Sequence, residues 1–295
     1  YSYQDVNEGG FFINPLDGDV LICDNDNVSP FGVNLGILGK QRYMAPEVVT
    51  GKNDPDKQSD RFSLAVILFR LLFINHPLEG KRSTPPCMTK ELEKRYYGEE
   101  PIFVYDPKDD RNRPVPGTDK NLKTFWHIYP QYIRELFEKA FSNDVMQKKA
   151  PRVIEKEWLD AFMKLKAGIV RCPHCKEETF LMQQGENVCM ECGKKILVPN
   201  AIQFSTVTLP LYPGAKLMLW HADSSQNDVE TALGQVVQNP KDPSVFGIRN
   251  DSSLSWKVNL PSGNQKPLAP GTVVPIKKDF ILECTNNPKD AATIL

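Results

Sequence analysis

Two Cys-x-x-Cys pairs constrain the fold of this chain more than any other feature of its sequence. Cys172 and Cys175 form the first pair, Cys189 and Cys192 form the second, and thirteen residues separate the pairs. Two such pairs supply four thiolates at the spacing of a tetrahedral metal site, which favours Zn²⁺. His174 lies inside the first pair, but four cysteines already complete the coordination shell, so we interpret it as a bystander.

The remaining cysteines support a metal site rather than a disulfide framework. The chain has seven cysteines, and the three outside the pairs are scattered at Cys23, Cys87 and Cys284. An odd number with paired spacing is typical of metal binding in a reducing compartment. We therefore expect a cytoplasmic protein.

The segment around the cysteines resembles a zinc ribbon. Residues 178–181 and the Gln-Gly-Glu turn at 184–186 fit a small hairpin, and residues 194–198 read as a strand. The resemblance implies a domain over residues 168–199 with a closed, structural zinc site. A segment of about 30 residues is too small to fold without its metal.

Acidic residues stand beside two short apolar runs near the start of the chain. The runs, 11–13 and 20–22, are separated by a glycine-containing turn, so we expect a hairpin. Asp5 lies before the first run and Asp24 after the second, and a hairpin would bring them to the same end. Two converging carboxylates suit phosphoryl transfer, in which one accepts the proton of a hydroxyl and the other holds Mg²⁺. The alternative is a pair of solvated turn aspartates.

Three further motifs follow in order. Glu47, in Tyr-Met-Ala-Pro-Glu, opens a helix, and Asp60 begins an apolar stretch that predicts a core helix over 59–73. Arg152 precedes an amphipathic helix. With Tyr-Gln-Asp at 3–5, these motifs resemble the C-terminal lobe of a bacterial-type, eukaryotic-like Ser/Thr protein kinase.

The kinase resemblance implies a role for each residue. Asp5 would be the catalytic aspartate and Asp24 the metal-binding one, with ATP and Mg²⁺ (or Mn²⁺) as cofactors. Glu47 would pair with Arg152, and Asp60 would accept backbone hydrogen bonds from the catalytic loop. The lobe would cover residues 1–167, and the protein would transfer the ATP γ-phosphate to hydroxyls of a protein substrate.

The chain departs from the kinase pattern at three places. Gly10 stands where the family has a metal-binding Asn, and Asn7 is the candidate substitute. Residues 24–26 are Asp-Asn-Asp instead of Asp-Phe-Gly. The Gly-rich phosphate loop, its Lys and the partner Glu of the N-terminal lobe are absent. The chain also begins with Tyr1 in mid-motif, so we expect a fragment of a longer parent, inactive alone. The alternative is a pseudokinase that works as a protein-binding scaffold.

The middle of the chain carries little nameable chemistry. Residues 79–124 are rich in charged residues, Pro and Gly, so we expect a surface insertion with short helices. His76, which ends the core helix together with a proline, is interpreted as structural. Apolar stripes at helical spacing predict two amphipathic helices, around residues 133–141 and 154–165.

From residue 203 onward, short β-rich runs alternate with turns. The runs are 204–209, 216–220, 234–237, 246–248, 256–258, 272–276 and 280–282. This spacing predicts an antiparallel β-sandwich over residues 200–295. The order Gly-x-Val, Asn-Pro, Phe-Gly-Ile-Arg-Asn-x-Ser and Trp resembles a degenerate forkhead-associated, phosphothreonine-binding domain. The resemblance implies phosphopeptide contact by Arg249, Asn250 and Ser253; the alternative is turn residues of a scaffold.

Composition limits the partners. The 295 residues have a net charge of −1, so nothing argues for nucleic-acid binding. No apolar run reaches the roughly 18–20 residues that span a bilayer. We expect a multidomain α+β protein in which the ribbon and the sandwich recruit a protein substrate or partner.

Overall fold

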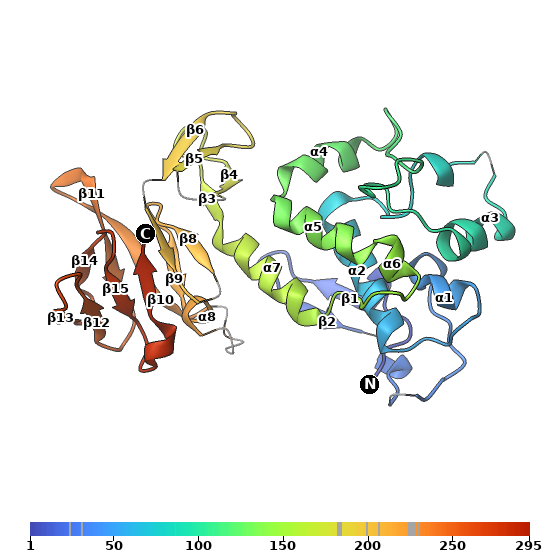
Figure 1. The fold of residues 1–295 in the computed structure, drawn as a ribbon, viewed down its shortest axis with the longest axis horizontal. Coiled ribbons are helices and arrows are strands. Elements are labelled where there is room, and N and C mark those ends of the chain that lie inside the picture. Colours follow the sequence, from blue (N-terminus) through green and yellow to red (C-terminus); the bar gives the residue numbers. More distant parts are fainter. Residues whose placement is uncertain are drawn as a thin grey trace. The chain divides into compact units, whose positions relative to one another are not determined.

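The chain forms two compact units, Tyr1–Ala161 and Phe162–Leu295. The computed structural model describes residues 1–23, 25–30, 32–85, 87–181, 185–198, 200–205, 207–223, 228 and 230–295. The first unit is mainly helical, and the second consists of antiparallel sheets (Figure 1). The predicted α+β class is therefore confirmed.

Helix α2 (Lys57–Phe73) is the centre of the first unit. It begins at Asp56, whose carboxylate accepts hydrogen bonds from the backbone N–H groups of Gln58 and Ser59, both at 2.8 Å. Other helices surround it: α1 (Pro46–Val49), α3 (Lys90–Lys94), α4 (Lys120–Ile128), α5 (Gln131–Ala140), α6 (Asn143–Met146) and α7 (Glu155–Ala167). The predicted core helix and both amphipathic helices are confirmed.

Aromatic rings fill the core of this unit. Phe69 of α2 is fully buried, and its ring lies 4.6–6.4 Å from five other ring centroids, those of Phe73, Phe103, Trp126, Phe137 and Phe141. Phe103 and Leu122, both fully buried, show that part of the stretch expected as a surface insertion is core instead. Burial of large aromatic side chains overrides the polar composition around them.

A hairpin precedes these helices. Strands β1 (Phe11–Ile13) and β2 (Val20–Ile22) pair antiparallel, with Phe11 opposite Ile22, as the sequence predicts. Short single-turn helices complete the connections: η1 (Glu8–Gly10), η2 (Asn25–Asn27), η3 (Gln41–Tyr43), η4 (Lys81–Ser83), η5 (Arg95–Glu99) and, in the second unit, η6 (Pro288–Asp290).

The second unit begins with two small two-stranded sheets that carry the cysteines. Strand β3 (Ile169–Arg171) pairs with β4 (Glu178–Phe180), and β5 (Gly185–Val188) pairs with β6 (Lys195–Val198). The predicted hairpin over 178–186 is wrong, because β4 and β5 belong to different sheets. Each Cys-x-x-Cys pair instead forms the turn of its own strand pair.

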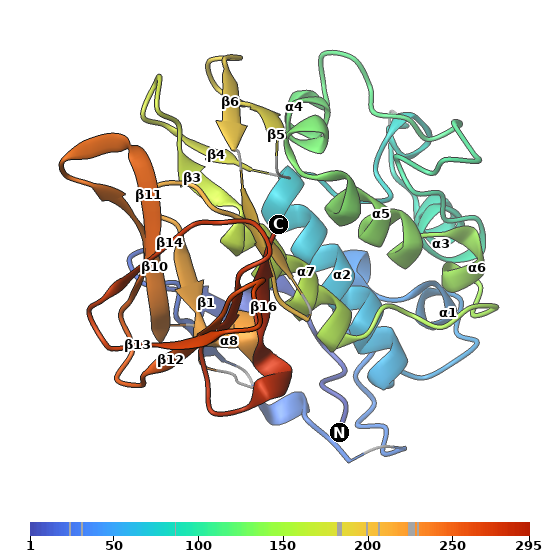
Figure 2. The ribbon, with the colours of Figure 1, turned by 60° about the vertical axis from the view of Figure 1, so that its left-hand side comes forward.

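Two larger antiparallel sheets follow and share one hydrophobic core, so they form a two-sheet β domain. One has the order β13-β12-β15-β16-β7-β8 and the other β14-β11-β10-β9. The bounds are β7 (Ala201–Gln203), β8 (Thr208–Pro210), β9 (Lys216–Met218), β10 (Ala232–Asn239), β11 (Asp242–Asn250), β12 (Trp256–Asn259), β13 (Gln265–Leu268), β14 (Val273–Pro275), β15 (Ile281–Glu283) and β16 (Ala292–Ile294). The β10–β11 hairpin is its longest arm (Figure 2).

Two predicted strands of the sandwich are wrong in detail. Only the end of the run 204–209 is a strand, because β8 begins at Thr208, while Phe204 and Val207 lie between β7 and β8 and are buried in the core. The run 216–220 begins as strand β9 and continues into helix α8 (Leu219–Ala222). Strands β13 and β16 lie in stretches where the sequence predicted none.

No helix in the described part of the chain combines the length and apolar character needed to cross a membrane.

Candidate functional site

The loop that carries Asp5 is fastened to the first turn of α2. The carboxylate of Asp60 accepts hydrogen bonds from the backbone N–H groups of Tyr3 at 2.6 Å and Gln4 at 3.0 Å. Burial raises the pKa of Asp60, and the two backbone donors oppose this rise. Asp60 therefore fixes the backbone immediately before Asp5.

Asp5 is oriented through one carboxylate oxygen. Its Oδ1 accepts hydrogen bonds from the backbone N–H of Lys40 at 2.8 Å and from the side-chain amide of Asn7 at 3.0 Å. None of the described residues donates a hydrogen bond to Oδ2. Gly39 has a φ of +87°, and a Cβ there would lie 3.0 Å from the carbonyl oxygen of Gln4. Glycine is thus required for Lys40 to reach the carboxylate.

Asn7 acts on Asp5 and on its own loop. Its Nδ2 donates to the backbone carbonyl and to Oδ1 of Asp5, both at 3.0 Å. Its Oδ1 accepts the backbone N–H of Gly9 at 2.9 Å and caps η1. The only side-chain oxygen of Asn7 is therefore engaged within the loop, and the neighbouring Gly10 has no side chain to offer.

The predicted metal-binding residue Asp24 lies outside the described residues. Its neighbour Cys23 lies against the Asp5 loop: its N–H donates to the carbonyl of Gly10 at 2.9 Å, and its carbonyl accepts the hydroxyl of Tyr3 at 2.6 Å. The β1–β2 hairpin thus returns the chain to this loop at residue 23.

Glu47 and Arg152 form a buried ion pair across the first unit. Arg152 Nη2 lies 2.8 Å from Glu47 Oε2, and the side chains are only 5% and 6% exposed. Arg152 also donates to the carbonyl of Gln58 at 2.5 Å and lies 5.5 Å from the ring centroid of Phe62. Lys148 approaches the other carboxylate oxygen at 3.8 Å. The pair joins α1 to the loop before α7.

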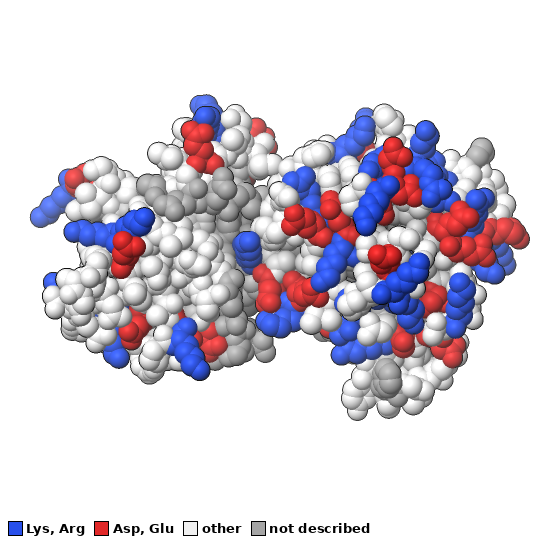
Figure 3. Space-filling view, viewed as in Figure 1, with Lys and Arg blue, Asp and Glu red and all other residues white. Residues whose placement is uncertain are grey.

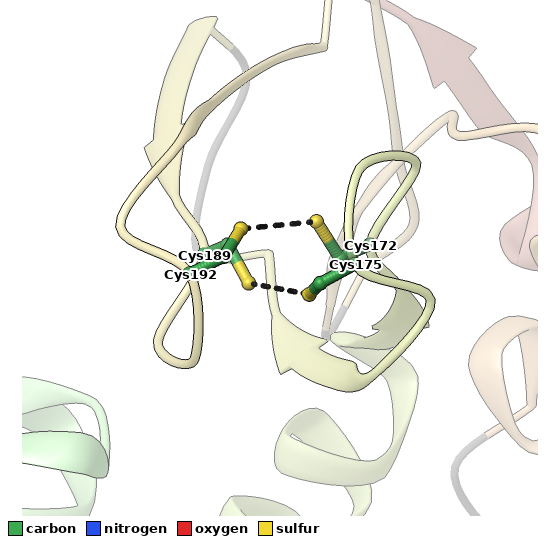
Figure 4. Close-up of side chains that lie close together, drawn as sticks. All are labelled: Cys172, Cys175, Cys189 and Cys192. Carbon is green, nitrogen blue, oxygen red and sulfur yellow. Dashed lines mark hydrogen bonds between the residues drawn. The ribbon is translucent and has the colours of Figure 1, made fainter.

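The four predicted cysteine ligands converge in the second unit (Figure 4). Their Sγ atoms all lie within 4.8 Å of one another; Cys172 is 3.9 Å from Cys192, and Cys175 is 3.7 Å from Cys189. Metal–sulfur bonds of about 2.3 Å give a tetrahedron with edges of about 3.8 Å. The distances are too long for disulfides, whose S–S bonds are about 2.05 Å. The cluster could hold a metal ion and is compatible with zinc.

The two cysteine turns share one backbone design. In the first, the N–H of Lys176 donates to the carbonyl of Cys172, and in the second the N–H of Gly193 donates to that of Cys189, both at 3.0 Å. Lys176 and Gly193 both have positive φ, at 69° and 67°. Backbone N–H groups of Cys192 and Glu191 lower the pKa of Cys189 to about 6, which favours the thiolate that metals bind.

His174 stays outside the sulfur cluster. Its Nε2 lies 3.2 Å from the carbonyl oxygen of Lys195, so this nitrogen is oriented toward the backbone. Its backbone N–H lies 3.3 Å from the Sγ of Cys172. Donors of this kind stabilise the negative charge of a thiolate.

The three residues predicted to contact a phosphopeptide, Arg249, Asn250 and Ser253, differ in how exposed they are. Asn250 is fully buried; its Nδ2 donates to the carbonyls of Leu254 and Leu268, and its Oδ1 accepts from Ser252. Its amide is therefore used to hold the loop after β11. Arg249 is partly exposed and paired with Asp251 at 2.5 Å, and Ser253 is exposed.

Sequence reasoning missed two contributors to the Asp5 site, the backbone N–H of Lys40 and the side chain of Gln4. Backbone donors leave no trace in residue type. The adjacent Gly39, in a glycine-rich stretch, was the available signal, because a glycine often marks close backbone approach.

No protein-family model matches this chain, and a search of curated proteins found no match either.

Proposed function

We propose that the first unit belongs to the catalytic domain of a protein-kinase-like enzyme that transfers the γ-phosphate of ATP to a serine or threonine hydroxyl. The observation that carries the proposal is the pair of hydrogen bonds from Tyr3 and Gln4 to Asp60. These contacts span 57 and 56 positions of sequence, and they fasten the backbone next to the proposed catalytic aspartate. The Glu47–Arg152 pair adds a second long-range contact of the kind the kinase resemblance implies.

Asp5 is the proposed proton acceptor. A substrate hydroxyl would donate its hydrogen bond to Oδ2, the oxygen that accepts none from the described residues. As the hydroxyl oxygen attacks the γ-phosphorus and the bond to the β-phosphate oxygen breaks, the proton passes to Asp5 and ADP leaves. Lys40 and Asn7, both bound to Oδ1, keep the carboxylate plane fixed during this transfer.

Mg²⁺ or Mn²⁺, when bound, would offset charge on the phosphates. Asp24 is the proposed ligand. Asn7 is the second proposed ligand: its oxygen accepts the N–H of Gly9, and one lone pair stays for a metal ion. Gly10, which has no side chain to bind a metal, favours the second candidate, a pseudokinase scaffold that binds proteins and transfers no phosphate.

Phosphotransfer from labelled ATP distinguishes the two candidates. The protein is assayed over a range of Mg²⁺ and Mn²⁺, beside Asp5→Asn and Asp24→Ala. Loss of a general base typically costs about 10²–10⁴-fold in rate, so we expect Asp5→Asn to lose at least about 100-fold. Asp19→Asn, which alters an exposed hairpin carboxylate, is the matched control and should retain activity. No incorporation by a folded wild-type protein would refute the enzyme and favour the scaffold.

For the second unit we propose a structural zinc site formed by the four cysteines. The support is the sulfur geometry. Four cysteine ligands fill a tetrahedral shell and leave no open coordination position for catalysis. Metal analysis of the chain purified in reductant without chelator should give one zinc per chain, and Cys189→Ser should lower it. A preparation that is folded but contains no zinc would refute the assignment.

We propose that the ribbon and sandwich recruit a protein partner. Arg249 and Ser253 remain the candidates for phosphopeptide contact, because both reach the surface. Arg249 would exchange its ion pair with Asp251 for a phosphate. On the face seen in Figure 3, acidic and basic side chains are interspersed, which does not favour a nucleic-acid partner. Binding of a phosphothreonine peptide library, with Arg249→Gln as the control, tests this role.

A further inference from the structure

The side chain of Gln4, adjacent to Asp5, forms a buried junction between two distant segments. Gln4 is only 4% exposed and has a φ of 64°, a strained conformation for a residue other than glycine. Its Nε2 donates to the carbonyl of Val33 at 2.6 Å and to the hydroxyl of Ser29 at 2.7 Å. Its Oε1 accepts the N–H of Leu35 at 3.3 Å. One amide thus binds three residues that lie 25–31 positions away.

Main-chain contacts extend the same junction. Ser2 and Ser29 exchange two backbone hydrogen bonds of 2.9 Å, and both residues are buried. The hydroxyl of Ser29 donates to the carbonyl of Val33 at 2.9 Å. Every group in this network is uncharged.

The stretch held by Gln4 leads directly to the Asp5 carboxylate. Five residues after Leu35 comes Lys40, whose N–H donates to Asp5 Oδ1. Between them, Gly39 passes against the carbonyl of Gln4, with no room for a side chain. The backbone of Gln4 is itself fixed by Asp60, so one residue connects α2, the stretch 29–35 and Asp5.

We propose that Gln4 is a positioning residue: its amide holds Ser29 and the stretch 32–40 so that Lys40 can orient Asp5, and the unmodified chain already has this order. Around Gln4 itself, the uncharged donors and acceptors of Ser29, Val33 and Leu35 satisfy one another, so this part of the stretch needs no phosphate. For its effect on catalysis the inference rests on the proposed kinase function; for the order of the stretch it does not.

The chemistry of the junction predicts how substitutions act. Gln4→Met keeps the length of the side chain and removes every hydrogen bond, so buried polar groups of Ser29, Val33 and Leu35 lose a partner. Gln4→Glu keeps the acceptor for Leu35 but places a carboxylate against the carbonyl of Val33. Both variants should release the stretch, and neither changes the backbone N–H that binds Asp60.

Hydrogen exchange of the full chain, measured by mass spectrometry, tests the ordering. In the wild type, with an intact mass equal to that of the unmodified sequence, we expect protection of the Leu35 and Lys40 amides. We expect exchange at least about tenfold faster in Gln4→Met and Gln4→Glu, with α2 amides unchanged. Gln41→Met is the matched control, because Gln41 is exposed and its side chain bonds only Glu93 among the described residues.

Two further comparisons keep the test decisive. If Gln4→Met also loses protection in α2, Ser29→Ala replaces it, since this variant weakens the junction from the other side and leaves Gln4 in place. Protection of the Leu35 amide in the wild type should be the same at about 0.05 M and about 0.5 M salt, because its bond to Gln4 is uncharged and salt screens only charged contacts. Unprotected Lys40 in the unmodified wild type, or unchanged exchange in the variants, would overturn the proposal.

The phosphotransfer assay separates this inference from the proposed function. If the wild type transfers phosphate, Gln4→Met should lower kcat by at least about tenfold and leave the KM for ATP nearly unchanged, because it disturbs the aspartate rather than nucleotide binding. Faster exchange with unaltered kcat would overturn the positioning role. No transfer by the wild type refutes the proposed kinase function, while the exchange experiment still decides whether Gln4 orders the stretch.

Discussion

The buried ion pair between Glu47 and Arg152 gives the sharpest test of what holds the first unit together. Replacing Arg152 by Met removes the charge and leaves Glu47, 6% exposed, without its partner at 2.8 Å. Breaking a buried pair from one side typically costs about 3–5 kcal/mol. Lys148 Nζ is partly exposed and lies 3.8 Å from the other carboxylate oxygen of Glu47, so it can move closer and offset part of the unpaired negative charge. We therefore expect the lower end, about 3 kcal/mol.

A double-mutant cycle measures how much of that cost comes from the interaction between Glu47 and Arg152. Glu47→Gln, Arg152→Met and the double variant are compared by urea unfolding, followed by far-ultraviolet circular dichroism, because most described helices lie in the first unit. The double variant should cost less than the sum of the single variants by about 2 kcal/mol or more. Lys156→Met, which breaks the exposed Lys156–Asp160 pair, is the control and should cost about 0.3–0.5 kcal/mol. Single costs that add within about 0.5 kcal/mol would refute the coupling.

Three other variants test particular contacts. Burial lowers the pKa of His76 from 6.5 to about 4, so between these pH values the unfolded state binds a proton that the folded state does not. The free energy of unfolding of the first unit should therefore fall by up to about 3 kcal/mol as the pH falls from 6.5 to 4. Unfolding curves of His76→Gln should lack this loss, and an unchanged pH slope in this variant would contradict the reasoning. Lys176→Gly relieves a positive φ and should raise the unfolding free energy of the metal-loaded second unit by about 1 kcal/mol, whereas Lys194→Gly should bring no gain. Asn250→Ala removes a buried amide with four hydrogen bonds and should cost the sandwich about 2–3 kcal/mol, measured by urea unfolding against the exposed Asn264→Ala.

Local patterns were enough to predict some parts of this fold. The core helix is recognisable from apolar residues on nearly every side and from Asp60 near its start, and both signals lie within the helix itself. The sulfur cluster is recognisable from the Cys-x-x-Cys spacing, because a short turn with its own backbone hydrogen bonds positions each pair. In both cases, the interactions that decide the structure lie within a few residues of one another.

Other parts depend on contacts that no local pattern carries. Phe204 and Val207 resemble strand residues only in being apolar and buried, because a turn also buries its apolar side chains when the core lies beneath it. Phe103 lies in a short apolar run, 102–105, between charged segments, and its packing on Phe69 and Phe141 shows that the run is core. The predicted pairing within 178–186 failed because cross-strand partners came from outside that stretch.

The two candidate sites differ in the same way. The sulfur cluster needs only two short turns to meet, and its backbone donors come from the cysteine turns themselves. Asp5 instead depends on Lys40, 35 residues away, while the backbone before it depends on Asp60. A sequence can therefore identify the ligands of the first site one by one, but it can identify the second only through the order of distant motifs. It follows that substitutions distant from Asp5 in the sequence, at Gly39 or Asp60, should disturb that carboxylate as strongly as substitutions of its sequence neighbours.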